Sequence, residues 1–565
     1  MATRMNPAQA VVASLTAHGV DTIFGLDGDH VIALFNALAD APAIRPITVK
    51  HENNAAIAAE VYGRLTGRPG VAVTTAGPGA TNSLSGVAGA YAAGAPLVHI
   101  SGGVPEDAAK EAFHGVDTVD FLQHAFTPVT KWSVRVEDAR EIPAVLQRAF
   151  ALAVSGRPGP VHVEIPLSTL AQDDFDVPAS ALAPAPTPTA PATGLESAIA
   201  RIDAAPAVAI VVGKGAWWPA VSEQVVRLAE RLGAPVAHSW DGHAAMPTVH
   251  PLSIGVYRGT AGSHPVAHDA IAAADLVLGI GVRPGTETAR QLADLLGDRL
   301  LLLDAADEPA DELAVAAPSV MTLAEAIGAL AEECRPRQEQ AAALAQCAHS
   351  RELQQRGIAI ELERYRDRRP WHIGYALDAL ARRMTPDLLV VSDVSQVKLW
   401  TPLQVPTFNP ESHLQPGSWG AMGYAVPGVL AAGLLRPGKK VVGVTGDASF
   451  QMACSDFGTI CQLGLPVVIA VHADGQIGMI HHALRTTYGR PYATEIGRVD
   501  FVRYAEAFGV RGIRVETPDA VGAAWDEALA ATGPVLLDLR AGHEFPFPWP
   551  VRRLVEQAEE VTSDA

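Results

Sequence analysis

Short apolar runs rich in Val, Ile and Leu recur along the chain and alternate with stretches of helical character. Each run is bounded by Gly, Pro or Asp. The clearest runs are residues 69–75, 96–100, 207–212, 276–280, 300–304, 388–393, 440–445 and 467–471. Continuous apolar runs of this kind are typical of parallel strands that helices cover on both faces. The pattern therefore predicts an α/β fold built from doubly wound parallel sheets.

Two shifts in composition divide this pattern into three parts. Residues 178–193 form an Ala/Pro/Thr stretch, and we expect a semi-extended linker with neither helix nor sheet pairing. Residues 331–369 are rich in Glu, Gln, Arg and Ala and predict a long surface helix that connects domains. The chain is therefore expected to hold three doubly wound domains, at residues 1–177, 195–330 and 370–550.

Size and charge exclude several classes of function. The chain has 565 residues, of which 48% are hydrophobic, and a formal net charge of −19. Such an acidic balance argues against binding to nucleic acid or to an anionic membrane surface. No apolar run approaches the roughly 18 residues that a transmembrane helix needs. The N-terminal stretch also lacks the sustained apolar core of a signal peptide.

The cysteines favour a cytoplasmic location. There are four, Cys334, Cys347, Cys454 and Cys461, and no two have CxxC spacing. This spacing indicates neither a zinc site nor a dithiol redox motif. So few cysteines in a long chain fit a reducing compartment.

Candidate chemistry lies where two neighbouring strands are predicted to end. The run 440–445 leads into Gly446, Asp447, Ala448 and Ser449, and the run 467–471 leads to Asp474. Ligands bind at the carboxyl ends of such strands. Two carboxylates there suit Mg²⁺ or Ca²⁺, and nearby glycines let backbone N–H groups approach a phosphate. Two strands that end in Gly and Asp without binding any ligand would show the same residues. This pattern alone therefore does not decide between a ligand site and ordinary strand ends.

Several stretches together resemble the thiamine diphosphate enzymes. Gly446, Asp447 and Ala448 stand in the place of the GDG element of that family's diphosphate motif, and Ala473 with Asp474 in the place of its NN element. Other stretches match in the family's order: residues 51–56 (HExxAA), 75–82 (SGPGATN), 159–166 (the strand closing the pyrimidine-binding domain), 392–396 (TDVGQ) and 420–424 (GAMGYG). Acetolactate synthases and benzaldehyde lyases have the most similar pattern.

The resemblance implies pyrimidine-binding, central and diphosphate-binding domains, with thiamine diphosphate and Mg²⁺ as cofactors. Glu52 would bind the pyrimidine ring and relay a proton. Without the surrounding motif, the same residue would be interpreted as a carboxylate that stabilises a helix N-terminus. Asp447, Asp474 and the carbonyl of Gln476 would hold Mg²⁺. Met422 would support the bent cofactor. The implied cofactor-binding set is Glu52, Ser395, Gln396, Gly420, Met422, Gly446, Asp447, Ala448, Ser449, Asp474, Gln476, Ile477, Gly478 and Met479.

The motif departs from the family at two places. Ala448 replaces the second glycine of GDG, and its methyl group narrows the space for a close backbone approach. Asp474 replaces an asparagine, which keeps an oxygen ligand but adds negative charge beside the diphosphate. We expect cofactor binding to survive these changes.

Asp29, His30 and His114 are the expected substrate-side catalytic residues, because imidazoles titrate near neutrality and can move protons on a reacting carbonyl. Loop-exposed polar residues without a catalytic role are the alternative. A Gly-Asp pair at Gly28 and Asp29 resembles simple 2-oxo acid decarboxylases, whereas a histidine at His30 resembles benzaldehyde lyase and some acetolactate synthase-like proteins. His114 stands where synthases and lyases usually carry Gln and decarboxylases carry His.

These residues leave several functions open. Acetolactate synthase-like decarboxylation and carboligation of 2-oxo acids ranks first. Benzaldehyde lyase-like cleavage or ligation of 2-hydroxy ketones ranks second, and simple 2-oxo acid decarboxylation third. A non-catalytic relative is the alternative from another class; Ala448 and Ala473 favour it, and the retained Glu52 argues against it. The ligands are therefore expected to be small 2-oxo acids, aldehydes or hydroxy ketones.

The resemblance also bears on other parts of the chain. Related synthases bind FAD in the central domain, where Gly213, Gly215 and Asp304 match the flavin pattern but several other positions do not, so FAD is not our expectation. The family places each cofactor between the first domain of one chain and the last domain of another, which implies a homodimer or homotetramer. The Pro-rich stretch 544–550 is expected to form either a lid or a packing strap.

Overall fold

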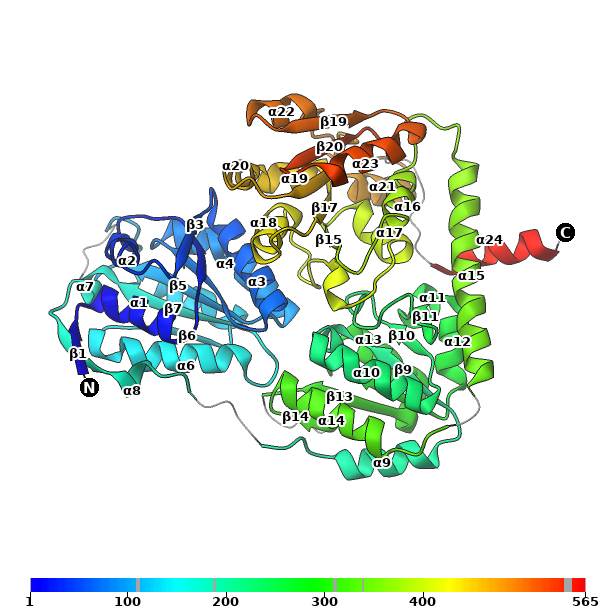
Figure 1. Cartoon of the computed structure of the whole chain (residues 1–565), viewed down its shortest axis with the longest axis horizontal. Helices are drawn as coiled ribbons and strands as arrows, with labels where there is room; N and C mark the ends of the chain where they lie inside the picture. Colours follow the sequence, from blue (N-terminus) through cyan, green and yellow to red (C-terminus); the bar gives the residue numbers. More distant parts are fainter. Residues whose placement is uncertain are drawn as a thin grey trace. The chain divides into compact units, whose positions relative to one another are not determined.

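Three six-stranded sheets, flanked by helices, form the framework of the molecule (Figure 1). The computed structural model describes residues 2–107, 112–185, 190–307, 312–337, 340–542 and 551–563. Every strand pair in the three sheets is parallel. The predicted α/β fold with three doubly wound parallel sheets is therefore confirmed, while the domain bounds stay a prediction. The expected lid or strap at 544–550 lies outside the described residues.

The first sheet has the strand order β3-β2-β4-β5-β7-β6. Its strands are β2 (Thr22–Gly25), β3 (Arg45–Thr48), β4 (Gly70–Thr74), β5 (Leu97–Gly103), β6 (Trp132–Arg135) and β7 (Pro160–Pro166). Its helices include α1 (Pro7–Ala17), α2 (Ile32–Leu38), α3 (Glu52–Thr66), α4 (Pro78–Ala93), α5 (Phe121–Phe126) and α6 (Ile142–Val154). The central strands β4, β5 and β7 are buried along their whole length, which explains their continuous apolar character.

The second sheet has the order β11-β10-β9-β12-β13-β14. Its strands are β9 (Val208–Val212), β10 (Val236–His238), β11 (Ser253–Val256), β12 (Leu276–Ile280), β13 (Leu300–Ala305) and β14 (Leu313–Ala317). Its helices include α9 (Leu195–Ala204), α10 (Pro219–Leu232), α12 (Pro265–Ala273), α13 (Glu287–Leu296) and α14 (Val320–Glu333).

The third sheet has the order β16-β15-β17-β18-β20-β19. Its strands are β15 (Leu389–Ser392), β16 (His413–Leu414), β17 (Val441–Gly446), β18 (Val467–His472), β19 (Arg511–Val515) and β20 (Val535–Leu539). The helices of this part of the sequence include α16 (Gly374–Ala381), α17 (Gln396–Gln404), α18 (Ala425–Leu435), α19 (Asp447–Ala453), α20 (Phe457–Gln462), α21 (Gly478–Tyr488), α22 (Phe501–Ala507) and α23 (Val521–Ala530).

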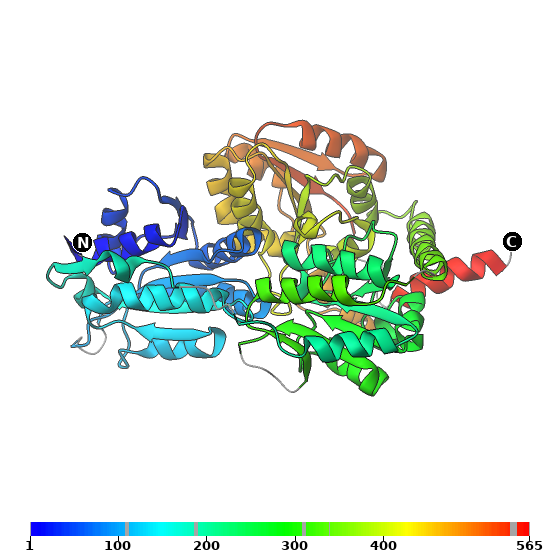
Figure 2. The same cartoon turned by 60° about the horizontal axis from the view of Figure 1, so that its bottom comes forward.

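A long helix, α15 (Ala341–Arg364), lies between the second and third sheets in the sequence. It buries one face, including Cys347, Leu353 and Leu362, so it is more than the surface connector that composition suggested. The last described helix, α24 (Val551–Ser563), packs against it, as both views show (Figures 1 and 2). Among the described residues, no helix is both long and apolar enough to cross a membrane.

Part of the expected linker is ordered, contrary to the prediction from its composition. Strand β8 (Phe175–Pro178) pairs antiparallel with β1 (Ala2–Met5), and a short helix, α8 (Ala179–Leu182), follows. The sequence Ala-Ser-Ala-Leu after Pro178 contains good helix formers, which the count of prolines over the whole stretch obscured.

The chain forms two compact units that do not follow the order of the sheets. The first unit comprises Met1–Pro188, Pro416–Leu435 and Ala453–Leu463, and the second comprises Thr189–Gln415, Arg436–Met452 and Gly464–Ala565. Helices α18 and α20 therefore belong with the first sheet.

Buried polar contacts account for that membership. The Tyr424 hydroxyl donates to Glu60 Oε2 at 2.7 Å, and Arg64 completes this buried group. Asn54 Nδ2 donates to Asp456 Oδ2 at 2.6 Å. Helix α3 is thus bonded to both late segments by groups that are costly to leave unpaired.

Candidate active site

Glu52 opens helix α3 and is nearly buried, with 8% of its surface exposed. His51 caps the helix, because its Nδ1 accepts a hydrogen bond from the backbone N–H of Asn53 at 3.1 Å. Asn82, on helix α4, donates from Nδ2 to Glu52 Oε2 at 3.0 Å. This bond fixes one carboxylate oxygen of Glu52. We assigned no role to Asn82 from the sequence, although it closes the motif at 75–82.

Two glycines lie close to Thr75, and one of them also borders the other oxygen of Glu52. A Cβ added at Gly79 would lie 3.4 Å from Glu52 Oε1 and 2.7 Å from Thr75 Cγ2. A Cβ at Gly28 would lie 2.7 Å from Thr75 Cβ. Within the described chain, the buried Thr75 Oγ1 has no hydrogen-bond partner. A polar atom buried in this way marks a place that a ligand or water can satisfy.

His30 and His114 are brought together, although they lie far apart in the sequence. Their rings stack with centroids 5.1 Å apart and an interplanar angle of 19°. Burial lowers the pKa of His30, the proximity of His114 lowers it further, and the exposed Asp29 opposes the shift. His30 is therefore a neutral imidazole at pH 7.

Both imidazoles have an unsatisfied nitrogen. Among the described residues, the Nδ1 atoms of His30 and His114 are buried without a hydrogen-bond partner. Phe113 stacks on His114 at 4.0 Å and is itself 65% exposed. The pair can therefore accept or donate a proton to a small polar ligand.

The two carboxylates predicted at the strand ends are neighbours. Strands β17 and β18 pair side by side, and Asp447 Oδ2 accepts a hydrogen bond from the backbone N–H of Gly475 at 2.6 Å. Asp447 Oδ1 accepts from the Ala448 N–H at 2.8 Å. Asp474 Oδ1 accepts from the Gln476 N–H at 3.2 Å.

Burial, together with the neighbouring charge of Asp474, raises the pKa of Asp447 to about 7. Burial also raises the pKa of Asp474 to about 7. Two buried acids this close are stabilised as carboxylates by a cation between them.

The donor set here fits Mg²⁺. Two carboxylates supply oxygen ligands. The side-chain oxygen Oε1 of Gln476 is a further buried oxygen, and it has no hydrogen-bond partner in the described part of the chain. No group of three or more His, Cys, Asp or Glu able to hold a metal occurs among the described residues. The remaining ligands of a hard cation would be a backbone carbonyl, water and phosphate oxygens, as is usual for Mg²⁺.

The surrounding turns are packed closely. A Cβ at Gly446 would lie 2.9 Å from the Cβ of Ser395, whose side chain caps helix α17. Ser449 Oγ donates to the Val394 carbonyl at 2.6 Å, so a phosphate contact from Ser449 would come from its backbone N–H. Gln396 is buried with 2% exposed.

The segment Gln476 to Met479 is held by a distant stretch that the sequence did not point to. The Ile477 N–H donates to the Thr494 carbonyl at 2.8 Å, and the Ile496 N–H to the Gly475 carbonyl at 3.0 Å. The ring of His481, one turn into α21, faces Thr494 Oγ1 at 3.1 Å. Ile477 and Gly478 stand directly at the start of that helix.

The predicted residues divide between the two units. Asp29, His30, Glu52 and His114 lie in the first unit, with Gly420 and Met422. Gly420 has a φ of +65°, and the neighbouring Trp419 donates from Nε1 to Ser85 Oγ at 3.1 Å. The other predicted cofactor-binding residues lie in the second unit.

The glycines of the central domain are explained by packing within the protein. A Cβ at Gly215 would lie 2.6 Å from Asp304 Oδ1 and 2.8 Å from Gly281 Cα. Asp304 Oδ1 also accepts from the Ala305 N–H at 2.9 Å.

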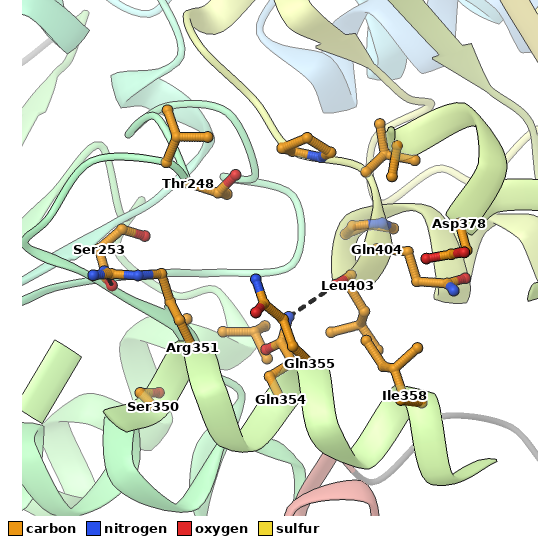
Figure 3. Close-up of a pocket in the computed structure, with 18 of the residues that line it drawn as sticks. Thr248, Ser253, Ser350, Arg351, Gln354, Gln355, Ile358, Asp378, Leu403 and Gln404 are labelled. Carbon is orange, nitrogen blue, oxygen red and sulfur yellow. Dashed lines mark hydrogen bonds between the residues drawn. The ribbon is translucent and has the colours of Figure 1, made fainter. Parts of the chain in front are cut away.

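The second unit also contains a cavity of about 850 Å³ beside α15 (Figure 3). Arg351, Gln354 and Ile358 of this helix line one wall, and Leu403 and Gln404 line another. Gln354 Nε2 donates to the Leu403 carbonyl at 2.9 Å. None of the predicted site residues lines this cavity.

Comparison with known proteins agrees with this geometry. Three family profiles match: the thiamine pyrophosphate enzyme N-terminal TPP binding domain at residues 5–127, the central domain at 195–330 and the C-terminal TPP binding domain at 393–539. The chain belongs to the thiamine pyrophosphate enzyme family. It is a thiamine diphosphate-dependent enzyme, as the resemblance implied.

Relatives within the family match over nearly their whole length. The acetolactate synthase large subunit of Haemophilus influenzae is 31% identical over 568 residues, which cover 97% of each chain. The acetolactate synthase of Bacillus subtilis is 29% identical, covering 94% of this chain and 92% of the relative. The probable acetolactate synthase large subunit of Methanococcus aeolicus is 28% identical, again covering 94% and 92%.

Proposed function

We propose that this protein decarboxylates a 2-oxo acid and joins the remaining fragment to a second carbonyl compound, in an acetolactate synthase-like reaction that depends on thiamine diphosphate and Mg²⁺. The observation that carries the proposal is the buried Glu52, bonded to Asn82, in a chain that matches acetolactate synthases over almost its full length. A non-catalytic relative would have no need for such an acid.

Glu52 is proposed to hold and move the proton that activates the cofactor. Because Asn82 occupies Oε2, the oxygen Oε1 beside Gly79 is left to exchange a proton with the pyrimidine ring. When bound, thiamine diphosphate supplies a nucleophilic carbon and an electron sink for cleavage of the carbon–carbon bond. Thr75 Oγ1 and Met422 are further candidates to contact it.

Asp447, Asp474 and the Gln476 carbonyl are proposed to hold Mg²⁺ against the diphosphate. The bond from Gly475 to Asp447 keeps the two strand ends together, so the carboxylates are already placed before metal binds. Backbone N–H groups at Ser449, Gly478 and Met479, with Ser395 and Gln396 near Gly446, complete the proposed diphosphate site. Ala448 and Ile477 are proposed to line it, because their own N–H groups already bond Asp447 and the Thr494 carbonyl.

His30 and His114 are proposed to act on the substrate. The neutral His30 can accept a proton from a hydroxyl or donate one to a carbonyl oxygen through its other nitrogen. Asp29, beside it and exposed, would assist protonation. We also propose, from the family resemblance, that the active form is a homodimer or homotetramer.

A benzaldehyde lyase-like reaction on 2-hydroxy ketones is the second candidate, and His30 favours it, because a histidine at that position resembles benzaldehyde lyase. Supplying pyruvate and assaying acetoin after acid treatment separates the two reactions. A synthase would consume pyruvate, whereas a lyase would leave it nearly untouched and cleave a 2-hydroxy ketone such as benzoin.

The cofactor proposal is tested by calorimetric titration of the apo protein with thiamine diphosphate, with and without Mg²⁺. Glu52→Gln should bind the cofactor but lose turnover by about a hundredfold or more, because the relay proton is gone. Asp447→Asn keeps an acceptor for the Gly475 N–H and should lose the Mg²⁺-dependent part of binding. Asp387→Asn, an exposed aspartate of the same unit, serves as control.

Wild-type turnover in Glu52→Gln would exclude the proposed role of Glu52 in proton transfer. Unchanged Mg²⁺-dependent binding in Asp447→Asn would remove the proposed metal site. Absence of binding in correctly folded wild-type protein would favour the inert-relative alternative.

A further inference from the structure

His114 has an unusual backbone conformation, and something must hold it there. Its φ of +63° lies in the left-handed region that side chains rarely adopt. Strain of this kind persists only where the surroundings fix the backbone. The described parts of the segment around it, 105–107 and 112–120, contain no regular helix or strand that could do so.

The backbone next to His114 is in close contact with Val104, at the end of β5. A Cβ added at Gly115 would lie 3.1 Å from Val104 Cγ1. The Gly115 N–H also bonds to the Ala112 carbonyl at 2.7 Å, which closes a tight turn around His114. The position of Val104 therefore helps to set the position of the turn.

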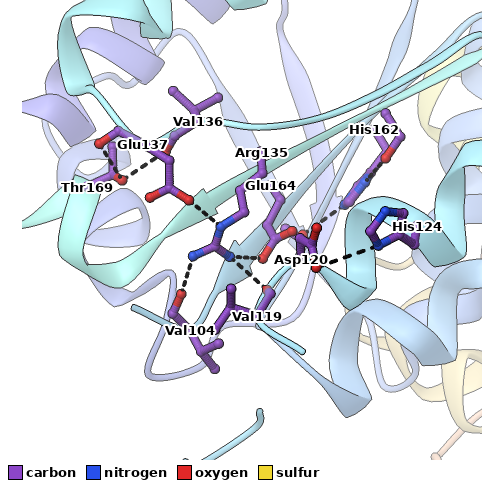
Figure 4. A network of polar contacts seen from close by, with 12 residues as sticks. Val104, Val119, Asp120, His124, Arg135, Val136, Glu137, His162, Glu164 and Thr169 are labelled. Carbon is purple, nitrogen blue, oxygen red and sulfur yellow. Dashed lines mark hydrogen bonds and ion pairs between the residues drawn. The ribbon is translucent and has the colours of Figure 1, made fainter. Parts of the chain in front are cut away.

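Arg135, on strand β6, fixes backbone on both sides of this turn. Its Nη2 donates to the Val104 carbonyl at 2.7 Å, and its Nη1 to the Val119 carbonyl at 3.2 Å. Figure 4 shows the guanidinium reaching both carbonyls while it lies between Glu137 and Glu164.

Two carboxylates hold the guanidinium in turn. Arg135 contacts Glu164 Oε1 and Glu137 Oε1, both at 2.5 Å. The side chains of Arg135 and Glu164 are only 5% and 1% exposed. Burial raises the pKa of Glu164 to about 7, and the charge of Arg135 opposes that shift. A planar guanidinium with five donors can make all these contacts at once, which a lysine cannot.

The geometry points to Arg135 as a positioning residue that, with Glu164, holds His114 in its left-handed conformation beside His30 and so sets the substrate side of the site. Arg135 touches neither His114 nor His30; it acts through Val104, Val119 and the turn between them. This inference rests on the proposed role of His114 in the reaction.

The test compares Arg135→Lys with Arg68→Lys in the holoenzyme. Lysine keeps the positive charge beside Glu164, so no buried carboxylate is left unpaired. Arg68 is a matched control in the same unit, because it also bonds a carbonyl (Gly19) and a carboxylate (Asp21) but touches no part of the His114 turn.

The first readout needs no activity. Hydrogen exchange of peptides covering 112–120 should become several-fold faster in Arg135→Lys and stay at the wild-type rate in Arg68→Lys. Equal exchange in the two variants would overturn the inference, whatever the substrate proves to be.

The second readout uses pyruvate as substrate and a double-mutant cycle with His114→Asn. Arg135→Lys should lower kcat/KM by about tenfold, and adding it to His114→Asn should lower kcat/KM little further. Additive losses would show that Arg135 does not act through His114. If wild-type enzyme leaves pyruvate unchanged, the proposed reaction fails, and the exchange result alone decides the role of Arg135.

Discussion

The imidazole of His114 is carried by a backbone that most side chains avoid, and this has a cost in stability. A residue with a Cβ in the left-handed region costs about 1–2 kcal/mol relative to the right-handed one. The carbonyl of His114 also lies directly against Gly77, where a Cβ would collide with it. The protein therefore gives up stability at this position, which is common where a side chain serves function.

Replacing His114 by Gly and by Ala separates that cost from the chemistry. Both variants lose the imidazole, so both should lose a similar share of kcat/KM. His114→Gly should be about 0.5–1 kcal/mol more stable than His114→Ala, because relief of strain exceeds the added entropy of glycine in the unfolded chain. Urea unfolding measures the difference, and equal midpoints would contradict a strained His114.

Among the elements, the turn from β17 to α19 follows most directly from the sequence. Gly446 ends the buried strand and Asp447 begins the helix. Glycine is required at Gly446 because the Ser395 side chain fills the space where a Cβ would be. The same serine caps α17, so one contact ties two turns of the proposed diphosphate site together.

Gly446→Ala should therefore disturb both turns. We expect a loss of about 1–3 kcal/mol in stability, together with weaker binding of thiamine diphosphate. Gly533→Ala is the control, since a Cβ there meets nothing within 4 Å and its φ is not positive. Thiamine diphosphate binding as tight in Gly446→Ala as in the wild-type protein would mean that the contact with Ser395 does not shape the site.

The parts of the molecule that could be predicted from the sequence are those determined by the pattern of apolar and polar residues over a few neighbouring positions. Buried strands such as β9 and β18 are continuous apolar runs, and Asp447 and Asp474 follow two of them. No local sequence pattern identifies Asn82, Thr494 or Arg135, because their roles depend on partners in other helices, strands and loops. The short edge strand β16 was missed, since two residues give no periodicity. Helix α8 was not predicted, because the high proline content of the linker as a whole hid the short helix-forming stretch at its start.

Across the whole molecule, buried histidines are kept neutral in both units. Burial lowers the pKa of His99 to about 3 in the first unit. It lowers the pKa values of His238 and His264 to about 4, and that of His372 to about 3, in the second. The unfolded chain takes up protons at these groups near pH 6.5, whereas the folded chain does not. Stability contributed by neutral burial is therefore complete above pH 6.5 and is lost as the pH falls toward 4.

His99→Gln should reduce this dependence on pH. Below pH 6, each such histidine adds about 1.4 kcal/mol per pH unit to the slope of the unfolding free energy against pH. The slope of the variant should be smaller by the contribution of one histidine. Glutamine can still bond Thr74 or Ser83, the two hydroxyl partners of His99. Urea unfolding of both proteins between pH 4.5 and 6 gives the slopes, and identical slopes would exclude His99 as a buried neutral group.

The discontinuous first unit limits how the gene for this protein can be recombined with that of a relative. Helix α3 carries Glu52, and its buried partners Tyr424 and Asp456 are encoded far downstream. A crossover placed in the linker at 178–193 would join an α3 from one parent to α18 and α20 from another. Residues 50–64, 416–435 and 453–463 therefore have to be inherited as one block, so the visible linker is a poor place to exchange domains.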